Sequence, residues 1–198
     1  MKNSKRVKAG GKLGREFYLR GAEVVALELI GKVIVHRVRG KELRARIVET
    51  EAYVGPHDLA CHASKGRTKR TEVMFGEGGH AYVYFIYGMH EMFNVVTGGA
   101  GDAQAVLVRA AEAIGGWDED VNLSGPGRFA RVMEIARTDN GRDLTADVLF
   151  FEEDWEWRGK IRRGARVGVD YAGAWKAEHL RFWDARSGAV SKPVPRED

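Results

Sequence analysis

The chain has 198 residues, of which 44% are hydrophobic and 30% are charged, and its formal net charge is +4. This size and composition fit one globular domain, and no segment approaches the roughly 20 apolar residues that span a membrane. The basic N-terminus lacks the apolar region of a secretory signal, so we expect none. The single cysteine, Cys61, excludes an internal disulfide and a cysteine-based zinc cluster.

Three regions are expected along the chain. Residues 1–15 are basic and contain glycines, which predicts a flexible tail; residues 16–191 form the domain, and residues 192–198 are expected to be loose. Basic residues also cluster at 65–70 and at 158–166. A charge run is most simply a solvated face, but several runs around an aromatic-rich segment favour a polyanionic partner.

The first half of the chain alternates between helical and strand patterns. Apolar residues at helical spacing predict a helix over 16–31, and the turn-rich stretch 55–71 predicts a long loop with at most a short helix. Alternation of apolar and polar residues predicts strands. These strands span 33–38, 43–54, 80–88 and 89–98. The first is expected to pair with the second, and the third with the fourth as a hairpin.

In the second half, residues 105–115 begin like a strand and end like a short helix. Ser124–Gly127 precedes a helical pattern, and Pro126 suits its first turn. Further strands are predicted at 147–152 and 165–171. Because no regular βαβ rhythm appears, we expect an α+β fold in a single domain, with a curved, mostly antiparallel sheet and surrounding helices.

Two carboxylates stand out in the second predicted strand. Glu49 and Glu51 are two residues apart, so both side chains point to one face of a strand, and Tyr53 extends that face. The bland interpretation is a solvent-facing strand edge. The functional interpretation is that one carboxylate is a general base beside an aromatic ring.

The histidines and the cysteine between 57 and 62 form no strong ligand pattern. His57 and His62 flank Asp58 and Cys61, but this spacing matches no usual zinc site. A histidine that hydrogen-bonds within a pocket fits better. Cys61 beside His62 does not by itself indicate a nucleophile, because neighbours in sequence rarely have the required geometry.

The stretch 82–87, YVYFIY, contains three tyrosines. Alternation places Tyr82 and Tyr84 on one side of the strand, while Val83, Phe85 and Tyr87 lie on the other. Val83, Phe85 and Ile86 are expected to face the interior. Aromatic rings near basic clusters suit exposed or flipped nucleobases, and tyrosine faces favour a cationic base by roughly 0.5–2 kcal/mol per contact.

Several longer stretches together resemble one known family. They are RIVETEAYVGPHDLACH (46–62), AYVYFIYGMHEMFN (81–94), AVLVRA (105–110), NLSGPGRF (122–129), RVGVDYAGAW (166–175) and LRFW (180–183). In this order and spacing, they are similar to the alkyladenine (3-methyladenine, or N-methylpurine) DNA glycosylase family. The resemblance covers about residues 20 to 185.

The resemblance implies hydrolysis of the N-glycosidic bond of alkylated purines flipped out of duplex DNA, which begins base excision repair; deaminated or etheno purines are further candidate substrates. Glu51 matches the general base that activates the attacking water. Arg109 and the backbone carbonyl of Val167 match groups that hold this water. No amine nucleophile is suggested, so the expected enzyme is monofunctional and needs no metal or organic cofactor.

The resemblance also assigns contacts to DNA. The residues around the flipped base are Tyr53, His62 and Tyr84. Asn94 lies below the base and disfavours the amino group of guanine, Tyr87 at the tip of a protruding hairpin enters the minor groove, and Arg128 lies near the phosphates. The chain departs from the usual family pattern at His90, Glu91 and Asp170, which bears on the range of lesions.

The expected partner is therefore double-stranded DNA with a damaged purine. The protein is expected to act as a monomer, without a membrane, inside the cell: in the cytoplasm or nucleoid of a bacterium, or the nucleus of a eukaryote. Two alternatives remain open. A non-catalytic nucleic-acid-binding module explains the tyrosines and basic clusters, and an enzyme acting on a soluble nucleoside or carbohydrate would use the Glu49/Glu51 pair.

Overall fold

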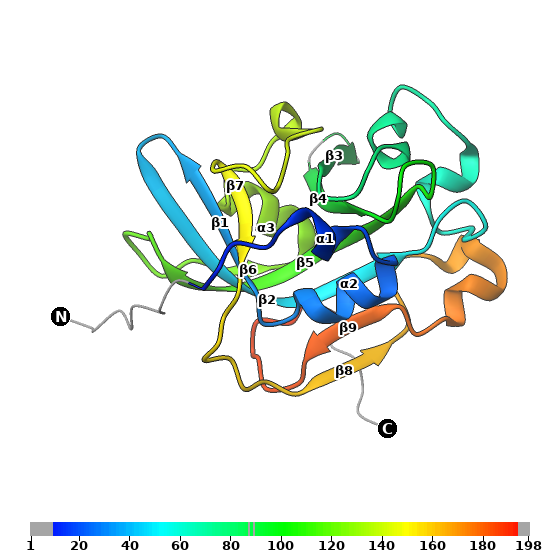
Figure 1. The fold of residues 1–198 in the computed structure, drawn as a ribbon. Helices are drawn as coiled ribbons and strands as arrows, with labels where there is room; N and C mark the ends of the chain where they lie inside the picture. Colours follow the sequence, from blue (N-terminus) through cyan, green and yellow to red (C-terminus); the bar gives the residue numbers. More distant parts are fainter. Residues whose placement is uncertain (1–9, 87, 89, 194–198) are drawn as a thin grey trace.

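The computed structural model describes residues 10–86, 88 and 90–193, and within them nine strands form one antiparallel sheet (Figure 1). The strands are β1 (Val33–Val38), β2 (Lys41–Tyr53), β3 (Ala81–Ile86), β4 (His90–Thr97), β5 (Gln104–Gly115), β6 (Leu123–Ser124), β7 (Leu149–Glu152), β8 (Ile161–Gly164) and β9 (Arg181–Asp184). The main order is β3-β4-β5-β2-β1-β7; β6 pairs with β5, and β8 pairs with β9, which itself pairs with β2. The curled antiparallel sheet and its few helices confirm the α+β expectation.

The helices are short. They are α1 (Arg15–Tyr18), α2 (Ala22–Leu29) and α3 (Pro126–Val132), with 3-10 segments η1 (His62–Lys65), η2 (Glu72–Phe75), η3 (Arg137–Asp139) and η4 (Asp170–Ala177). The single helix predicted over 16–31 is therefore two helices. The chain breaks because the Ala22 backbone N–H donates to Gln104 Oε1 at 2.8 Å, which starts a new helix after the extended Gly21. Pro126 is in the first turn of α3, as predicted.

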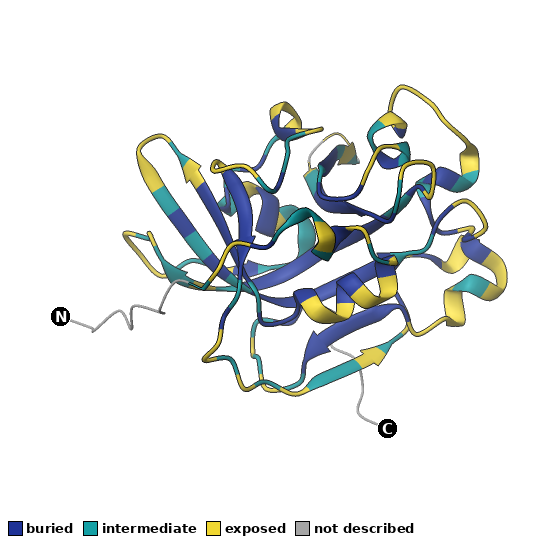
Figure 2. Ribbon diagram, viewed as in Figure 1, coloured by how far each residue is buried: buried dark blue, intermediate teal, exposed yellow. Residues whose placement is uncertain are grey.

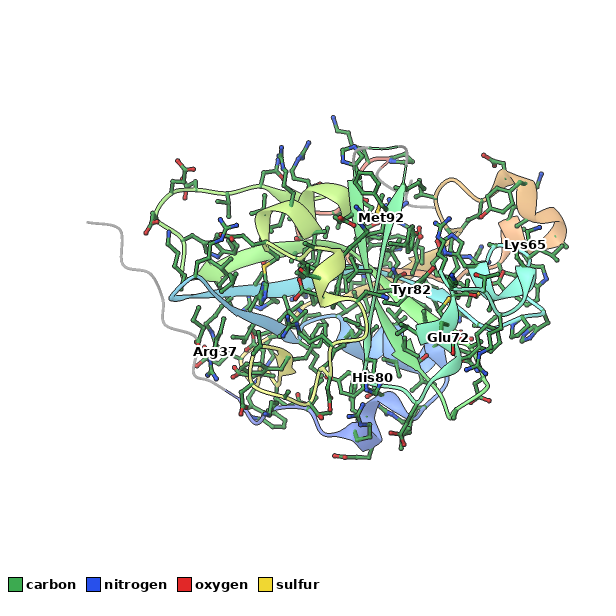
Figure 3. The ribbon with its side chains drawn as sticks, turned by 90° about the horizontal axis from the view of Figure 1, so that it is seen from above. Arg37, Lys65, Glu72, His80, Tyr82 and Met92 are labelled. Carbon is green, nitrogen blue, oxygen red and sulfur yellow. The ribbon has the colours of Figure 1, made fainter. Side chains whose placement is uncertain are left out.

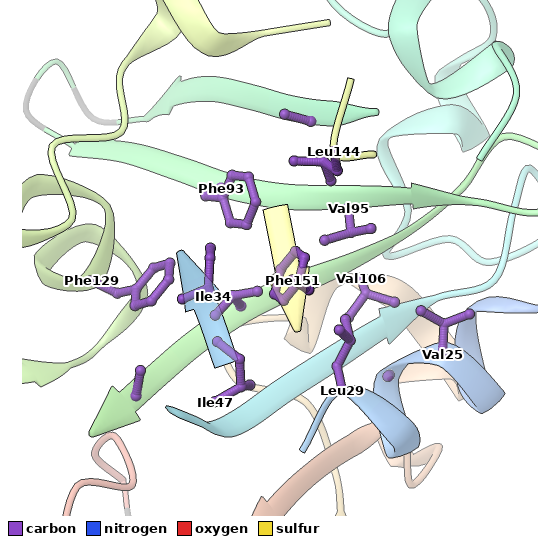
Figure 4. Close-up of a cluster of buried hydrophobic side chains, with 14 of the residues drawn as sticks. Val25, Leu29, Ile34, Ile47, Phe93, Val95, Val106, Phe129, Leu144 and Phe151 are labelled. Carbon is purple, nitrogen blue, oxygen red and sulfur yellow. The ribbon is translucent and has the colours of Figure 1, made fainter. Parts of the chain in front are cut away.

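The main core lies between the curled sheet and helices α2 and α3 (Figure 4). Val25 and Leu29 of α2 pack with Ile47 of β2, and Phe93 of β4 contacts Phe129 of α3 with ring centroids 6.2 Å apart. The central strands are buried along most of their length, whereas the outer side of α2 faces solvent (Figure 2). The polar residues Glu49, Thr50 and Glu51 of β2 are therefore enclosed by protein.

Two predictions for the second half of the chain were wrong. Residues 105–115 do not end as a helix, because β5 pairs with β2 along its whole length, from Tyr53–Ala105 to Arg44–Gly115. The small side chains of Ala110 and Ala111 are buried on this strand, whereas Ala113 is exposed. Residues 165–171 are not a strand but a loop that leads into η4. Strands β8 and β9 were not predicted.

The predicted hairpin is confirmed, with Tyr84 opposite Met92 in the β3–β4 pair. Val83 is buried in the main core, as expected. Phe85 is not interior: 39% of it is exposed, and the Arg137 guanidinium lies 5.0 Å from its ring centroid. The reason is that β3 is the edge strand, and its far end extends past the core.

Part of the expected N-terminal tail packs against the sheet. The backbone of Lys12 forms an isolated antiparallel β-bridge with Glu152, and Leu13 is buried in the main core. In the part of the chain that the structure describes, no helix is both long enough and apolar enough to cross a membrane.

Candidate active site

Two of the three register shifts between β2 and β5 lie beside Glu49. Ile47 lies opposite Ala111 and Glu49 opposite Ala110, so two residues on β2 match one on β5. Thr50 then lies opposite Val108, so one residue on β2 matches two on β5. Val48 on β2 and Arg109 on β5 therefore have no opposite residue. A bulge increases local twist and redirects side chains, and such irregularities occur often beside active sites.

The two faces of β2 differ at this point. The Thr50 hydroxyl donates to the Ala26 carbonyl of α2 at 2.8 Å, so this residue faces the helix. Glu49 and Glu51 share the other face, as predicted, and the side chain of Arg109 reaches both. Neither glutamate is at a solvent-facing edge, because β9 covers this part of β2 and both residues are fully buried.

Glu51 accepts contacts from three donors. The Val167 backbone N–H donates to Oε1 at 2.8 Å, and the Arg109 Nη1 lies 3.2 Å from the same oxygen. The Tyr53 hydroxyl donates to Oε2 at 2.9 Å. These donors hold the carboxylate in one orientation. Val167 is thus placed beside Glu51 as expected, although the contact recorded is through its N–H group.

Glu49 has four donors and no role in the sequence-based site. Arg109 Nε and Arg181 Nε donate to Oε1 at 2.8 and 2.7 Å, and the Ser191 hydroxyl donates to it at 3.0 Å. The Ser191 backbone N–H donates to Oε2 at 2.6 Å. Burial alone would lower the pKa of Arg109. The negative charges of Glu51 and Glu49 together have a larger effect, so the pKa of Arg109 is raised.

Tyr53 is held from behind by a buried ion pair. The Arg166 guanidinium lies 4.8 Å from the Tyr53 ring centroid and pairs with Asp58, and neither side chain of the pair is exposed. Burial and the nearby Glu51 carboxylate raise the pKa of Tyr53 well above its usual value, so its hydroxyl keeps its proton and remains a donor. Arg166 directly precedes Val167, so this pair also fixes the segment that contacts Glu51.

His62 and Tyr84 lie together, as expected, with ring centroids 4.6 Å apart in an edge-to-face arrangement. His62 Nδ1 and the Tyr82 hydroxyl are 3.0 Å apart, so Tyr82 also contacts this histidine. Burial, with a smaller effect of the Arg70 charge, lowers the pKa of His62 to about 4. The histidine is therefore neutral near pH 7.

The aromatic cluster is within electrostatic reach of Glu51. Burial is the main cause of the raised pKa of Tyr84, and the Glu51 carboxylate contributes to it. The Arg70 guanidinium lies 5.0 Å from the Tyr84 ring centroid. Figure 3 shows Tyr82 on the β3–β4 hairpin beside the segment that carries Lys65 and Glu72. The basic loop 65–70 therefore adjoins the aromatic cluster.

Asn94 is buried on β4, where its side-chain amide donates to the Tyr82 and Met92 carbonyls at 3.1 and 3.3 Å. It is thus fixed beside the strand that carries Tyr84. Arg128 is exposed on α3, and its Nη1 donates to the Ser124 carbonyl at 3.1 Å. Tyr87 lies outside the described residues.

A groove of about 1780 Å³ extends from Arg109 and Ser191 along β5 to Asp118, and Arg128 also lines it. It does not include the aromatic residues Tyr53, His62 and Tyr84. The rings of His62, Tyr82 and Tyr84 pack on one another, so little open space remains between them. The donors and acceptors around Glu51, rather than the size of the groove, locate the candidate site.

The histidine and cysteine residues near 60 are not gathered as ligands. His57 packs on Trp175 with centroids 5.4 Å apart, and Cys61 is buried with its Sγ 3.8 Å from the Ala103 carbonyl. Burial raises the pKa of Cys61 to about 11, so its thiol keeps its proton. Across residues 10–86, 88 and 90–193, no three His, Cys, Asp or Glu side chains are placed to hold a metal ion.

The site therefore combines an enclosed carboxylate, an arginine, a backbone N–H group and a cluster of aromatic rings. The structure brings together Glu51, Arg109, Tyr53, His62 and Tyr84, which the sequence had indicated as candidate site residues. Sequence reasoning missed the contacts of Arg166, Arg181 and Ser191. Arg166 and Arg181 lie within conspicuous stretches, but no local pattern indicates which distant carboxylate each arginine meets.

Comparisons with known proteins show the family to which the chain is similar. A family model described as "Methylpurine-DNA glycosylase (MPG)" matches residues 16–188. A Myxococcus xanthus protein is 50% identical over 184 residues, which cover 92% of this chain and 95% of that protein. An Anaeromyxobacter protein is 51% identical (86% and 88% covered), and one from Methanocella arvoryzae is 45% identical (92% and 97% covered). Each of the three is named "Putative 3-methyladenine DNA glycosylase".

Proposed function

Because the chain belongs to the methylpurine-DNA glycosylase family and is a DNA glycosylase that acts on methylated purines, we propose that it hydrolyses the N-glycosidic bond of alkylated purines flipped out of duplex DNA. The products are the free base and an intact strand with an abasic site. The observation that carries the proposal is the buried Glu51 carboxylate, held by three donors beside an aromatic cluster.

Glu51 is the general base in this proposal. A carboxylate offers about four lone-pair positions, and the three donors occupy three of them. The remaining position accepts a proton from the water that attacks the sugar C1′. Arg109 and the Val167 carbonyl hold that water, and the negative charge of Glu51 stabilises the oxocarbenium-like sugar.

The aromatic cluster of Tyr53, His62 and Tyr84 receives the flipped base. An alkylated purine such as 3-methyladenine is cationic, and tyrosine ring faces attract a cation by roughly 0.5–2 kcal/mol per contact. A neutral His62, whose pKa is lowered to about 4, adds no opposing charge. Because the cationic base is already a good leaving group, it needs little acid catalysis. Asn94, fixed on β4, disfavours the amino group of normal guanine.

The β3–β4 hairpin enters DNA in this proposal, with Tyr87 filling the space that the flipped nucleotide leaves. Base flipping costs a few kcal/mol of stacking and pairing, and an inserted side chain offsets part of this cost. The assignment of Tyr87 rests on the family resemblance. Arg128 and the basic loop 65–70 supply contacts to phosphates, so binding weakens as salt concentration rises.

The test is base release from duplex DNA that carries one defined lesion, with the liberated base identified by mass spectrometry. We expect release of 3-methyladenine or 7-methylguanine, with the DNA strand left intact until alkali cleaves the abasic site. Binding of the same duplex without base release would instead indicate a non-catalytic binding module. Release from free nucleosides but not from duplex DNA would indicate a nucleoside hydrolase.

A further inference from the structure

Arg109 connects the two buried glutamates through different nitrogens. Its Nε donates to Glu49 Oε1 at 2.8 Å, its Nη1 lies 3.2 Å from Glu51 Oε1, and its Nη2 donates to the Ser191 hydroxyl at 3.1 Å. The shorter of the two carboxylate contacts is to Glu49. All three nitrogens of the guanidinium are therefore engaged, and only one of them faces Glu51.

A guanidinium with a single carboxylate neighbour usually binds it at two points. Such a two-point pair on Glu51 would occupy lone-pair positions that the base needs for its water. Glu49 prevents this by holding Nε, and Ser191 prevents it by accepting from Nη2. Arg181, which also donates to Glu49, balances the second carboxylate, so two arginines neutralise two glutamates.

We propose that Glu49 is a positioning residue for base release: it acts through Arg109, with Arg181 and Ser191 as its supports, to keep Arg109 from closing a two-point pair on Glu51. The inference rests on the proposed glycosylase function. It also gives the segment around Ser191 a part in the reaction, because both the hydroxyl and the backbone N–H of this residue bind Glu49.

Glu49→Gln tests the proposal, because it keeps the size of the side chain and removes its charge. The measurements are the single-turnover rate of 7-methylguanine release and the Kd for the same duplex. We expect the rate to fall about tenfold or more, because buried groups in contact are strongly coupled. We expect Kd to change less than about twofold. The matched control is Glu152→Gln, which changes another buried glutamate that pairs with an arginine, Arg44, away from the site.

A double-mutant cycle with Arg109→Lys separates positioning from a merely structural role. Lysine cannot bridge both carboxylates, so Glu49→Gln should cause no further loss of rate in the Arg109→Lys background. An equal loss in both backgrounds would overturn the proposal, as would a wild-type rate in the single variant. Thermal melting reports whether each variant is folded.

Ser191→Ala is the second variant, and it carries the test if Glu49→Gln does not fold. It keeps the backbone N–H that binds Glu49 and removes only the hydroxyl between Glu49 and Arg109. We expect a fall in rate of about threefold, absent in the Arg109→Lys background. If Ser191→Ala releases the base at the wild-type rate, the proposal for Glu49 is overturned, but the glycosylase function is not, because the wild-type protein still releases the base. Absence of release by the wild-type protein would overturn that function and this inference together.

Discussion

The Tyr53 hydroxyl donates a hydrogen bond to Glu51 Oε2 at 2.9 Å, on the carboxylate oxygen that the Val167 N–H does not contact. Tyr53 and Glu51 are on the same strand and two residues apart, so the strand itself sets this contact. The tyrosine ring therefore serves two purposes: its face borders the proposed base pocket, and its hydroxyl orients the proposed general base.

Tyr53→Phe separates these two purposes. The ring and its contact with Arg166 remain, but Glu51 loses one donor. A hydrogen bond to a charged group contributes about 1.5–3 kcal/mol, so we expect base release to slow by roughly tenfold or more while DNA affinity changes little. Single-turnover kinetics and a binding titration measure the two effects. A loss of affinity with an unchanged rate would assign the hydroxyl to substrate binding.

Tyr18→Phe is the matched control for the loss of a tyrosine hydroxyl. The Tyr18 side chain is buried, and its hydroxyl has no hydrogen-bond partner among the described residues. Removing an unsatisfied buried hydroxyl should leave the free energy of unfolding unchanged or raise it by about 1 kcal/mol. Urea denaturation measures this change, and a clear loss of stability would indicate a bound water or another partner.

The Asp58–Arg166 pair is expected to be the most sensitive ionic contact. Asp58→Asn leaves the fully buried Arg166 without its counter-charge, and breaking such a pair costs about 3–5 kcal/mol. Urea denaturation should show this loss of unfolding free energy. Glu72→Gln, which removes one partner of the exposed Arg67–Glu72 pair, should cause no measurable change. Equal effects at the two sites would contradict the account of Arg166.

The lowered pKa of His62 predicts that the stability of the folded protein depends on pH. The pKa of His62 is lowered to about 4 in the folded protein, from 6.5, mainly by burial. Between these values the unfolded chain takes up a proton that the folded protein does not, so stability falls as pH decreases from about 6.5 to about 4. Urea denaturation across this range should show a steeper fall for the wild type than for His62→Phe. Parallel curves would mean that His62 protonates normally.

The sequence predicted those parts of the site that depend on local alternation. Two-residue spacing correctly placed Glu49 and Glu51 on one face, and likewise Tyr82 and Tyr84. The hairpin β3–β4 followed from the same pattern. These predictions succeeded because a strand fixes the direction of alternate side chains whatever lies beyond it.

Other features depend on long-range pairing and were not predictable. The bulge at Arg109 arises from the register between β2 and β5, which no local pattern encodes. The segment 165–171 has alternating residues, yet it is a loop, because Arg166 turns inward to Asp58 while the Val167 N–H binds Glu51. The short strands β8 and β9 were missed since their charged residues hide the apolar pattern.

The most direct test of the central claim is single-turnover release of 7-methylguanine from duplex DNA by the wild-type protein and by Glu51→Gln. Glutamine keeps the size of the side chain but cannot accept a proton from water at neutral pH. We predict unchanged DNA affinity, with release at least about a thousandfold slower than wild type, in line with the loss of a general base and of transition-state charge stabilisation. Substantial release by Glu51→Gln at wild-type affinity would contradict the assignment of Glu51 as the base.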